Sequence, residues 1–196
     1  MNATKLATRG LLIGMLGVML SGCAAVVVTG AATGAAVVHD RRTTGTVVED
    51  QEILLRAITL REQDDSLKNK ANINIDVYNL QVLLTGQAEN PEIVERFRQQ
   101  VADIKRVRTV FNEVAIGAES TWSEATADAY LTSKVKIALF DVKIEGFDPT
   151  RVHVTSSQGS VYLMGLLTST EADAVTDKVR YVSGVKRVVK LFEYHE

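Results

Sequence analysis

Histidines are the side chains of this sequence best suited to binding a metal ion, and there are three of them: His39, His153 and His195. A zinc-type site needs three or four nitrogen, sulfur or carboxylate ligands at characteristic spacings. No cysteine or carboxylate cluster accompanies these histidines at such a spacing. The sequence therefore predicts no metal site.

The polar residues also lack the spacing that serine or carboxylate catalysis requires. The serine-rich segment Thr155–Ser160 has no identifiable base to orient a nucleophile, and it is better interpreted as a hairpin turn. The acidic run Glu62–Asp65 is better interpreted as the solvated end of a helix. Because the sequence has no GxSxG turn, phosphate-binding glycine loop or HExxH motif, we predict a protein that is not an enzyme and needs no cofactor.

The single cysteine, Cys23, follows a short apolar segment near the N-terminus. The apolar run Leu11–Leu20 has ten residues, and it continues into Leu20–Cys23, which reads LSGC. A run of this length is typical of a signal-peptide core and is shorter than the roughly 20 residues of a membrane-spanning helix. The LSGC segment resembles the lipobox of bacterial lipoproteins. That resemblance implies that residues 1–22 are a signal peptide and that Cys23 becomes an acylated N-terminus.

Residues 23–46 are predicted to be a lipidated tether. Within it, Ala24–Val38 contains 15 small, mostly apolar residues, too few to span a bilayer. Gly30 and Gly34 have the GxxxG spacing that lets membrane helices pack closely, so helix pairing is the alternative interpretation. Lipid chains contribute roughly 0.8 kcal/mol per buried CH₂, so acylation alone would anchor the chain. The lipobox resemblance further implies, from the alanine after the cysteine, an outer-membrane location facing the periplasm.

Charge and cysteine content exclude two further classes of protein. The chain has 22 basic and 24 acidic residues, a net charge of −2, and removal of Lys5 and Arg9 with the signal peptide leaves 20 against 24, or −4. Such a chain has no overall positive field to attract nucleic acid. With one cysteine it forms no internal disulfide, so packing must stabilise the fold.

The rest of the chain contains an internal repeat. Ile73–Gly86 aligns with Val152–Gly165 without a gap at an offset of 79 residues, and the apolar positions coincide. After one polar loop the offset becomes 78, so that Phe97, Val101 and Ile104 align with three valines of the second copy. We therefore expect two similar units, at 47–117 and 125–196, joined by a connector at 118–124.

Each copy shows the same succession of periodicities. Apolar residues recur at helical spacing in Asp50–Arg61 and Asp128–Phe140, and two short alternating runs joined by a turn then predict a hairpin. A second helical pattern and a last apolar strand follow. The order helix–strand–strand–helix–strand predicts an α+β fold in which two helices cover one face of a three-stranded sheet.

These motifs resemble the BON domain. The second copy contains Asp128 at its first helix, then a glycine–x–valine–x–leucine–x–glycine strand at Gly159–Gly165, and then VSGVKRV at Val182–Val188. The first copy departs from this pattern in having Leu80 in place of Gly159 and no glycine in place of Gly184. A lipobox followed by two such copies is similar to dual-BON outer-membrane lipoproteins. The resemblance implies binding of anionic phospholipid and a role in envelope integrity, at division sites or near the outer-membrane assembly machinery.

The first helix of the second copy has an apolar stripe beyond the one needed for its core. The stripe consists of Tyr130, Ile137 and Phe140, with Lys134 and Lys136 beside it. At an offset of 78 the first copy has Glu52, Thr59 and Glu62 in place of the three apolar residues, and Arg56 in place of Lys134. Aromatic rings next to cations suit the headgroup region of a membrane. Taken with the family resemblance, which implies a phospholipid ligand, this predicts that the stripe, with Trp122 of the connector, binds anionic phospholipid such as phosphatidylglycerol.

The alternative is that the stripe packs against the first copy. The protein would then be an adaptor for envelope or outer-membrane assembly proteins, and it would use exposed sheet edges rather than lipid recognition. Trp122 has the same two interpretations, since a lone tryptophan in a connector often fills a gap between domains. Exposure of the stripe in the folded protein favours the lipid hypothesis, and burial favours the adaptor.

Overall fold

The computed structural model describes residues 40–117 and 121–195, apart from the side chain of Trp122. The predicted signal peptide, Cys23 and most of the predicted tether lie outside these residues. The described residues belong to one compact unit, His39–Glu196. Within them, no helix is both long enough and apolar enough to cross a membrane.

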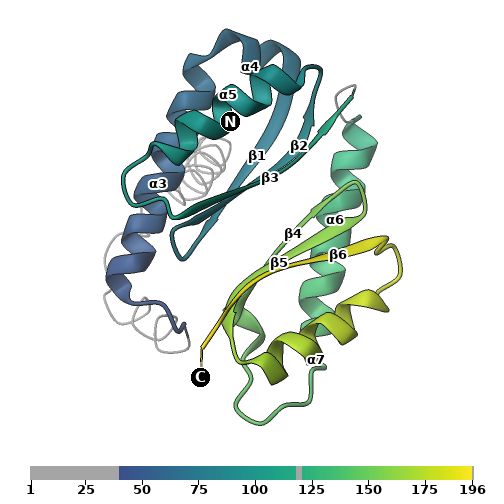
Figure 1. The fold of residues 1–196 in the computed structure, drawn as a ribbon. Coiled ribbons are helices and arrows are strands. Elements are labelled where there is room, and N and C mark those ends of the chain that lie inside the picture. Colours follow the sequence, from purple (N-terminus) through teal and green to yellow (C-terminus); the bar gives the residue numbers. More distant parts are fainter. Residues whose placement is uncertain (1–39, 118–120, 196) are drawn as a thin grey trace, which may run out of the picture. The chain divides into compact units, whose positions relative to one another are not determined.

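Two copies of one α+β unit follow each other along the chain (Figure 1). The first copy consists of α3 (Thr44–Gln63), α4 (Asp65–Lys70), β1 (Ala71–Tyr78), β2 (Gln81–Ala88), α5 (Pro91–Ala102) and β3 (Thr109–Ile116). The second consists of α6 (Trp122–Leu139), the 3₁₀ turn η2 (Pro149–Arg151), β4 (Val152–Ser157), β5 (Ser160–Leu167), α7 (Ser169–Arg180) and β6 (Arg187–Tyr194). The predicted αββαβ order is confirmed. The short helix α4 is an addition that the periodicities did not predict.

Both sheets have the same topology. In the first copy β1 and β2 form an antiparallel hairpin, with Val77 opposite Val82, and β3 returns through α5 to lie parallel to β2. In the second copy β5 is likewise the central strand, antiparallel to β4 and parallel to β6. The long helices of each copy lie on the same face of its sheet (Figure 1). Alternate residues of each central strand therefore point toward helices.

The first helix of each copy begins earlier than the apolar spacing predicted. Thr43 and Thr121 are the N-caps, because each hydroxyl accepts a hydrogen bond from a backbone amide of the first turn. Asp50 and Asp128 consequently lie inside helices rather than at their starts. Both carboxylates accept hydrogen bonds from the hairpin turn of their own copy, at Leu80 N (2.7 Å) in one case and Gly159 N (3.1 Å) in the other. Each helix is thus linked to its hairpin.

Each copy has a hydrophobic core between its helices and its sheet. Val82 and Leu84 of β2 and Val161 and Leu163 of β5 are fully buried there. Phe97 is the largest fully buried side chain of the first core. These are the residues whose alternation predicted one buried face for each sheet.

The opposite faces of the central strands are buried as well. Leu83 of β2 and Met164 of β5 are both inaccessible to solvent and belong to one cluster with Tyr78 and Tyr162. Polar contacts surround this cluster: Arg187 Nη2 lies 2.8 Å from Glu113 Oε2, and His153 Nε2 lies 2.6 Å from Asp76 Oδ1. Because this cluster joins the helix-free faces of both sheets, the copies share a third core that alternation within one copy did not predict.

Candidate functional site

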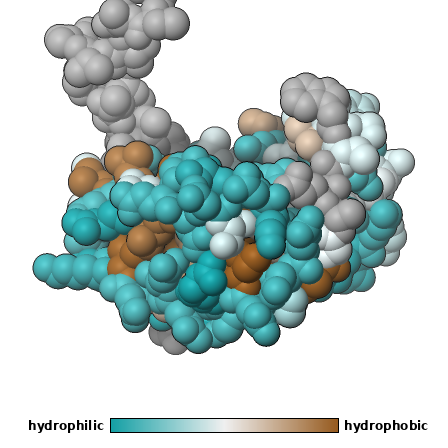
Figure 2. Space-filling view, turned by 90° about the horizontal axis from the view of Figure 1, so that it is seen from above, coloured by the Kyte–Doolittle hydropathy of each residue, from teal (hydrophilic) through white to brown (hydrophobic). Residues whose placement is uncertain are grey.

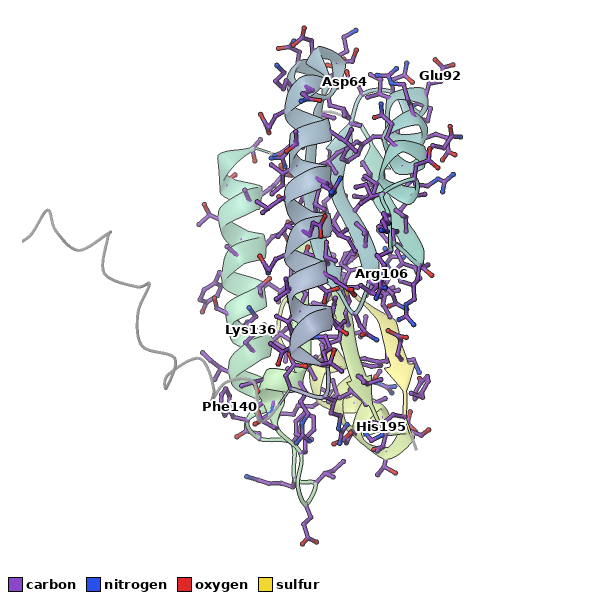
Figure 3. All side chains as sticks on the ribbon, turned by 90° about the vertical axis from the view of Figure 1, so that its left-hand side faces the viewer. Asp64, Glu92, Arg106, Lys136, Phe140 and His195 are labelled. Carbon is purple, nitrogen blue, oxygen red and sulfur yellow. The ribbon has the colours of Figure 1, made fainter. Side chains whose placement is uncertain are left out.

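The apolar stripe of α6 is on the solvent side of that helix. Tyr130, Ile137 and Phe140 are 67%, 70% and 68% exposed, whereas Leu131 and Val135 on the other side pack in the core. Side chains this apolar are seldom left so open without a binding role when they gather on one element. Figure 3 shows Lys136 and Phe140 at the same end of α6. Much of the face drawn in Figure 2 is hydrophilic, with small separate hydrophobic groups.

Two lysines accompany the stripe in different ways. Lys134 donates a hydrogen bond to the carbonyl of Ser183, and its ammonium lies 5.6 Å from the centroid of the Tyr130 ring. This distance is within the range of a cation–π interaction. Lys136 is exposed and forms no ion pair within the described part of the chain. The helix therefore presents one cation held against an aromatic ring and one that is free to meet an anion.

On the equivalent surface of the first copy, the cation is held by an ion pair. Arg56 donates to Glu52 at 2.6 Å, four residues apart on the exposed face of α3. These two residues stand where the second copy has Lys134 and Tyr130. At the positions of the stripe, the contrast expected from the sequence between polar residues in the first copy and apolar residues in the second is thus present on the folded surface.

A second feature of the stripe was not predicted from the sequence. The loop after α7 lies beside α6, and Lys134 of the helix donates a hydrogen bond to the carbonyl of Ser183 in the loop. A hollow of about 630 Å³ between them is lined by Tyr130, Lys134, Gly184 and Lys186. The only sequence signal for it was the departure of the two copies from each other at position 184.

Two arginines near the end of the predicted tether, Arg41 and Arg42, are bound to the two copies. Both terminal nitrogens of Arg41 donate to the Glu171 carboxylate, at 2.5 and 2.9 Å. Arg42 donates to Asp50 at 2.7 Å and stacks 4.0 Å over the ring of Tyr78. Burial by itself would raise the pKa of Glu171, but the hydrogen bonds from Arg41 and Thr168 outweigh it and hold that pKa below its ordinary value. We call this pair of arginines the clasp.

Two predicted site residues lie outside what the structure describes, and one of the histidines considered in the sequence forms a structural contact. The side chain of Trp122 and all of Cys23 are outside the described residues, although Trp122 is the first residue of α6. His153 pairs with Asp76. No group of three or more metal-ligating side chains occurs among residues 40–117 and 121–195.

The described chain is thus two copies of one αββαβ unit, each with a carboxylate of its first helix bonded to its hairpin turn. The BON signature matches residues 55–118 and 127–196. The chain therefore belongs to the BON-domain family. It is 32% identical over 195 residues, covering 99% of both chains, to a protein of Haemophilus influenzae named "Outer membrane lipoprotein DolP".

Two further proteins are similar. A "21 kDa hemolysin" of Actinobacillus pleuropneumoniae is 32% identical over 158 residues, which are 79% of each chain. A solved structure of CdsD, a structural protein of the type III secretion system of Chlamydia trachomatis, covers 74% of this chain and 92% of its own at 12% identity and a TM-score of 0.30. Similarity this low carries no functional argument. Neither the BON family nor the lipoprotein relative is named as an enzyme.

Proposed function

We propose that this chain is a non-enzymatic outer-membrane lipoprotein that binds anionic phospholipid. In this proposal a lipid on Cys23 is the permanent anchor, and the stripe on α6 of the second BON domain is a second, weaker contact on the periplasmic side. The protein would support envelope integrity, at division sites. The name of the relative that is similar over 99% of both chains supports the outer-membrane location.

The exposure of Tyr130, Ile137 and Phe140 carries this proposal. Three large apolar side chains at 67–70% exposure lie in contact with water on a helix whose core face is already occupied. Their burial in a headgroup and acyl-chain boundary removes apolar surface from water, at about 25 cal/mol per Å². Lys134 and Lys136 would add about 1 kcal/mol each near an anionic surface, and salt would reduce this attraction.

The experiment compares stripe variants in a chain carrying Cys23→Ser, so that no lipid is attached. Ile137→Glu is expected to abolish co-sedimentation with vesicles that contain equal amounts of phosphatidylglycerol and phosphatidylcholine, and Lys134→Glu to weaken it. Thr59→Glu changes the equivalent exposed position of the first copy and is the matched control. If Ile137→Glu and Lys134→Glu remain folded and bind as well as the parent, the stripe is not the lipid contact.

A protein-interaction role is the second candidate. Val48 and Leu55 lie seven residues apart on α3, are each 63% exposed, and form an apolar surface on the first copy. This observation favours a partner protein for the first BON domain, such as an outer-membrane assembly or division protein. A parent chain that fails to bind vesicles but loses a partner on Leu55→Glu would favour the adaptor.

A further inference from the structure

The hollow beside the stripe is built differently in the two copies. The repeat places Ala127 and Gly184 of the second copy where the first has Glu49 and Arg106, at the same offset of 78. Backbone geometry supports this alignment: Arg106 and Gly184 both have positive φ, of 78° and 102°, and the amides of Val107 and Val185 bond to the equivalent carbonyls of Ile104 and Val182.

In the first copy this space is bridged by an ion pair. Arg106 Nη2 lies 2.7 Å from Glu49 Oε2, so a guanidinium from the loop reaches the first helix. In the second copy both members of that pair are replaced by the two smallest residues. Ala127 and Gly184 line the hollow of about 630 Å³ instead of filling it.

The hollow also holds an exposed cation, Lys186. Its side chain forms no hydrogen bond or salt bridge within the described part of the chain, and it interacts electrostatically with Glu124, which lines the same hollow. At the equivalent position of the first copy, Arg108 is committed to the carbonyl of Asn79 at 2.8 Å and to Glu193. The cation of the second copy is therefore available to a ligand.

Lys186 lies against Gly159. A Cβ atom at Gly159 would stand 2.9 Å from Lys186 Cδ and 3.1 Å from its Cγ and Cε. The aliphatic part of Lys186 therefore packs directly on the glycine, and the backbone amide of Lys186 donates to the Gly159 carbonyl at 2.9 Å. The first copy has the equivalent backbone hydrogen bond, from Arg108 N to the Leu80 carbonyl at 2.9 Å, but has a leucine in place of the glycine.

The carboxylates of the hollow are occupied by protein donors. Glu124 accepts from the amide and hydroxyl of Thr121 at 2.7 and 2.9 Å. Asp128 accepts from the amides of Gln158 and Gly159 at 2.8 and 3.1 Å. Both carboxylates thus fix a helix start or a turn, while the ammonium of Lys186 and the Tyr130 ring lie beside open space.

We propose that this hollow binds the phosphate of a glycerophospholipid headgroup, with Lys186 as the main contact and Lys134 as the second. The inference rests on the proposed function and gives the stripe a specific polar neighbour. Acyl chains would lie along Ile137 and Phe140 while the phosphate occupies the space left by Ala127 and Gly184. A phosphate oxygen accepts charge-assisted hydrogen bonds from ammonium groups, which are about twice as strong as neutral ones.

The test closes the hollow with the pair that the first copy already uses. The double variant Ala127→Glu/Gly184→Arg leaves the net charge unchanged and imitates Glu49 and Arg106. In the Cys23→Ser chain it is expected to weaken binding to phosphatidylglycerol–phosphatidylcholine vesicles about tenfold, the equivalent of 1.4 kcal/mol. Lys186→Gln is expected to do the same without altering the loop. Glu49→Ala/Arg106→Gly opens the first copy and should leave binding unchanged.

The outcomes separate this inference from the proposed function. If Ile137→Glu abolishes binding while the closed variant and Lys186→Gln bind as the parent does, the headgroup site is refuted and the stripe stands. If the parent itself does not bind, both proposals fail. Short-chain phosphatidylglycerol is expected to displace the vesicles. If glycerol phosphate or inorganic phosphate displaces them at the same concentration, the ligand is a free phosphate or phosphate ester, and the lipid assignment is overturned.

Discussion

Asp50 and Leu80 are 30 residues apart in sequence, and the buried Asp50 carboxylate accepts a hydrogen bond of 2.7 Å from the Leu80 amide. Leu80 has a φ of 64°, in the left-handed region that glycine favours, and Gly159 has the same role in the second copy. Asp50 also accepts from Asn79 N at 2.8 Å and pairs with Arg42. One carboxylate thus supports a strained turn, a helix and the end of the tether.

Asp50→Ala should therefore be among the most damaging polar substitutions in the first copy. It leaves two turn amides without their acceptor and removes one of the two carboxylates that pair with Arg42, and loss of one partner of such a network costs about 3–5 kcal/mol. Chemical denaturation measures the free energy of unfolding. Asp65→Ala removes a carboxylate that is 87% exposed and is expected to change it by less than about 0.5 kcal/mol. Equal effects of the two variants would mean that the Asp50 network is not stabilising.

Gly86→Ala should destabilise the first sheet. Gly86 has a φ of 113°, and an added Cβ would lie 2.0 Å from the carbonyl oxygen of Asn72 on the neighbouring strand. The hairpin would have to separate, at a cost of about 2–3 kcal/mol in unfolding free energy. Gly117→Ala is the control, because nothing lies within 4 Å of a Cβ there. Thermal unfolding of the two variants decides the point: unchanged melting of Gly86→Ala would contradict the strand geometry.

The clasp makes a pH-dependent contribution to stability. The pKa of Glu171 is lower in the folded protein than in the unfolded chain, so its ion pair with Arg41 stabilises the fold above the ordinary carboxyl pKa. That contribution is lost as the pH falls through the lowered value. Arg41→Ala is expected to cost about 1.5–3 kcal/mol at pH 7 and progressively less in acid.

Unfolding free energies of the parent and of Arg41→Ala across the acidic range measure this effect. Lys178→Ala breaks an exposed pair with Asp141 and serves as the control, with a small effect at every pH. A difference between parent and Arg41→Ala that is constant with pH would show that the Glu171 pair is not its source.

The sequence predicted the repeat and the αββαβ order because these depend on local periodicity and on the register between the copies. It also predicted that α6 has an apolar stripe that α3 lacks at the equivalent positions, since Tyr130, Ile137 and Phe140 are more apolar residues than one helix face needs. The helix starts were missed because Thr43 and Thr121 act through cap hydrogen bonds, which apolar spacing does not report.

The third core and the hollow depend on contacts between residues that are far apart in the sequence. Leu83 and Met164 alternate with residues of the first two cores, so within one strand they looked like the outward-facing set, and only the pairing of two sheets buries them. Gly184 matches the BON pattern in the sequence, but its effect on the hollow depends on Ala127, which lies far from it in sequence. Nothing in either residue alone indicates that Arg106 and Glu49 meet in the other copy.

Leu83 and Met164 are buried on the helix-free faces of the two sheets, so neither copy is expected to be stable as a separate fragment. A fragment that ends after the first repeat would expose the apolar, helix-free face of its sheet to water. A fragment that begins after the first repeat would do the same. Such fragments would aggregate or associate with each other. The complementary fragment, added as a separate chain, would bury the exposed sheet face again. Each copy therefore depends on the other for its stability, and the two do not behave as independent domains.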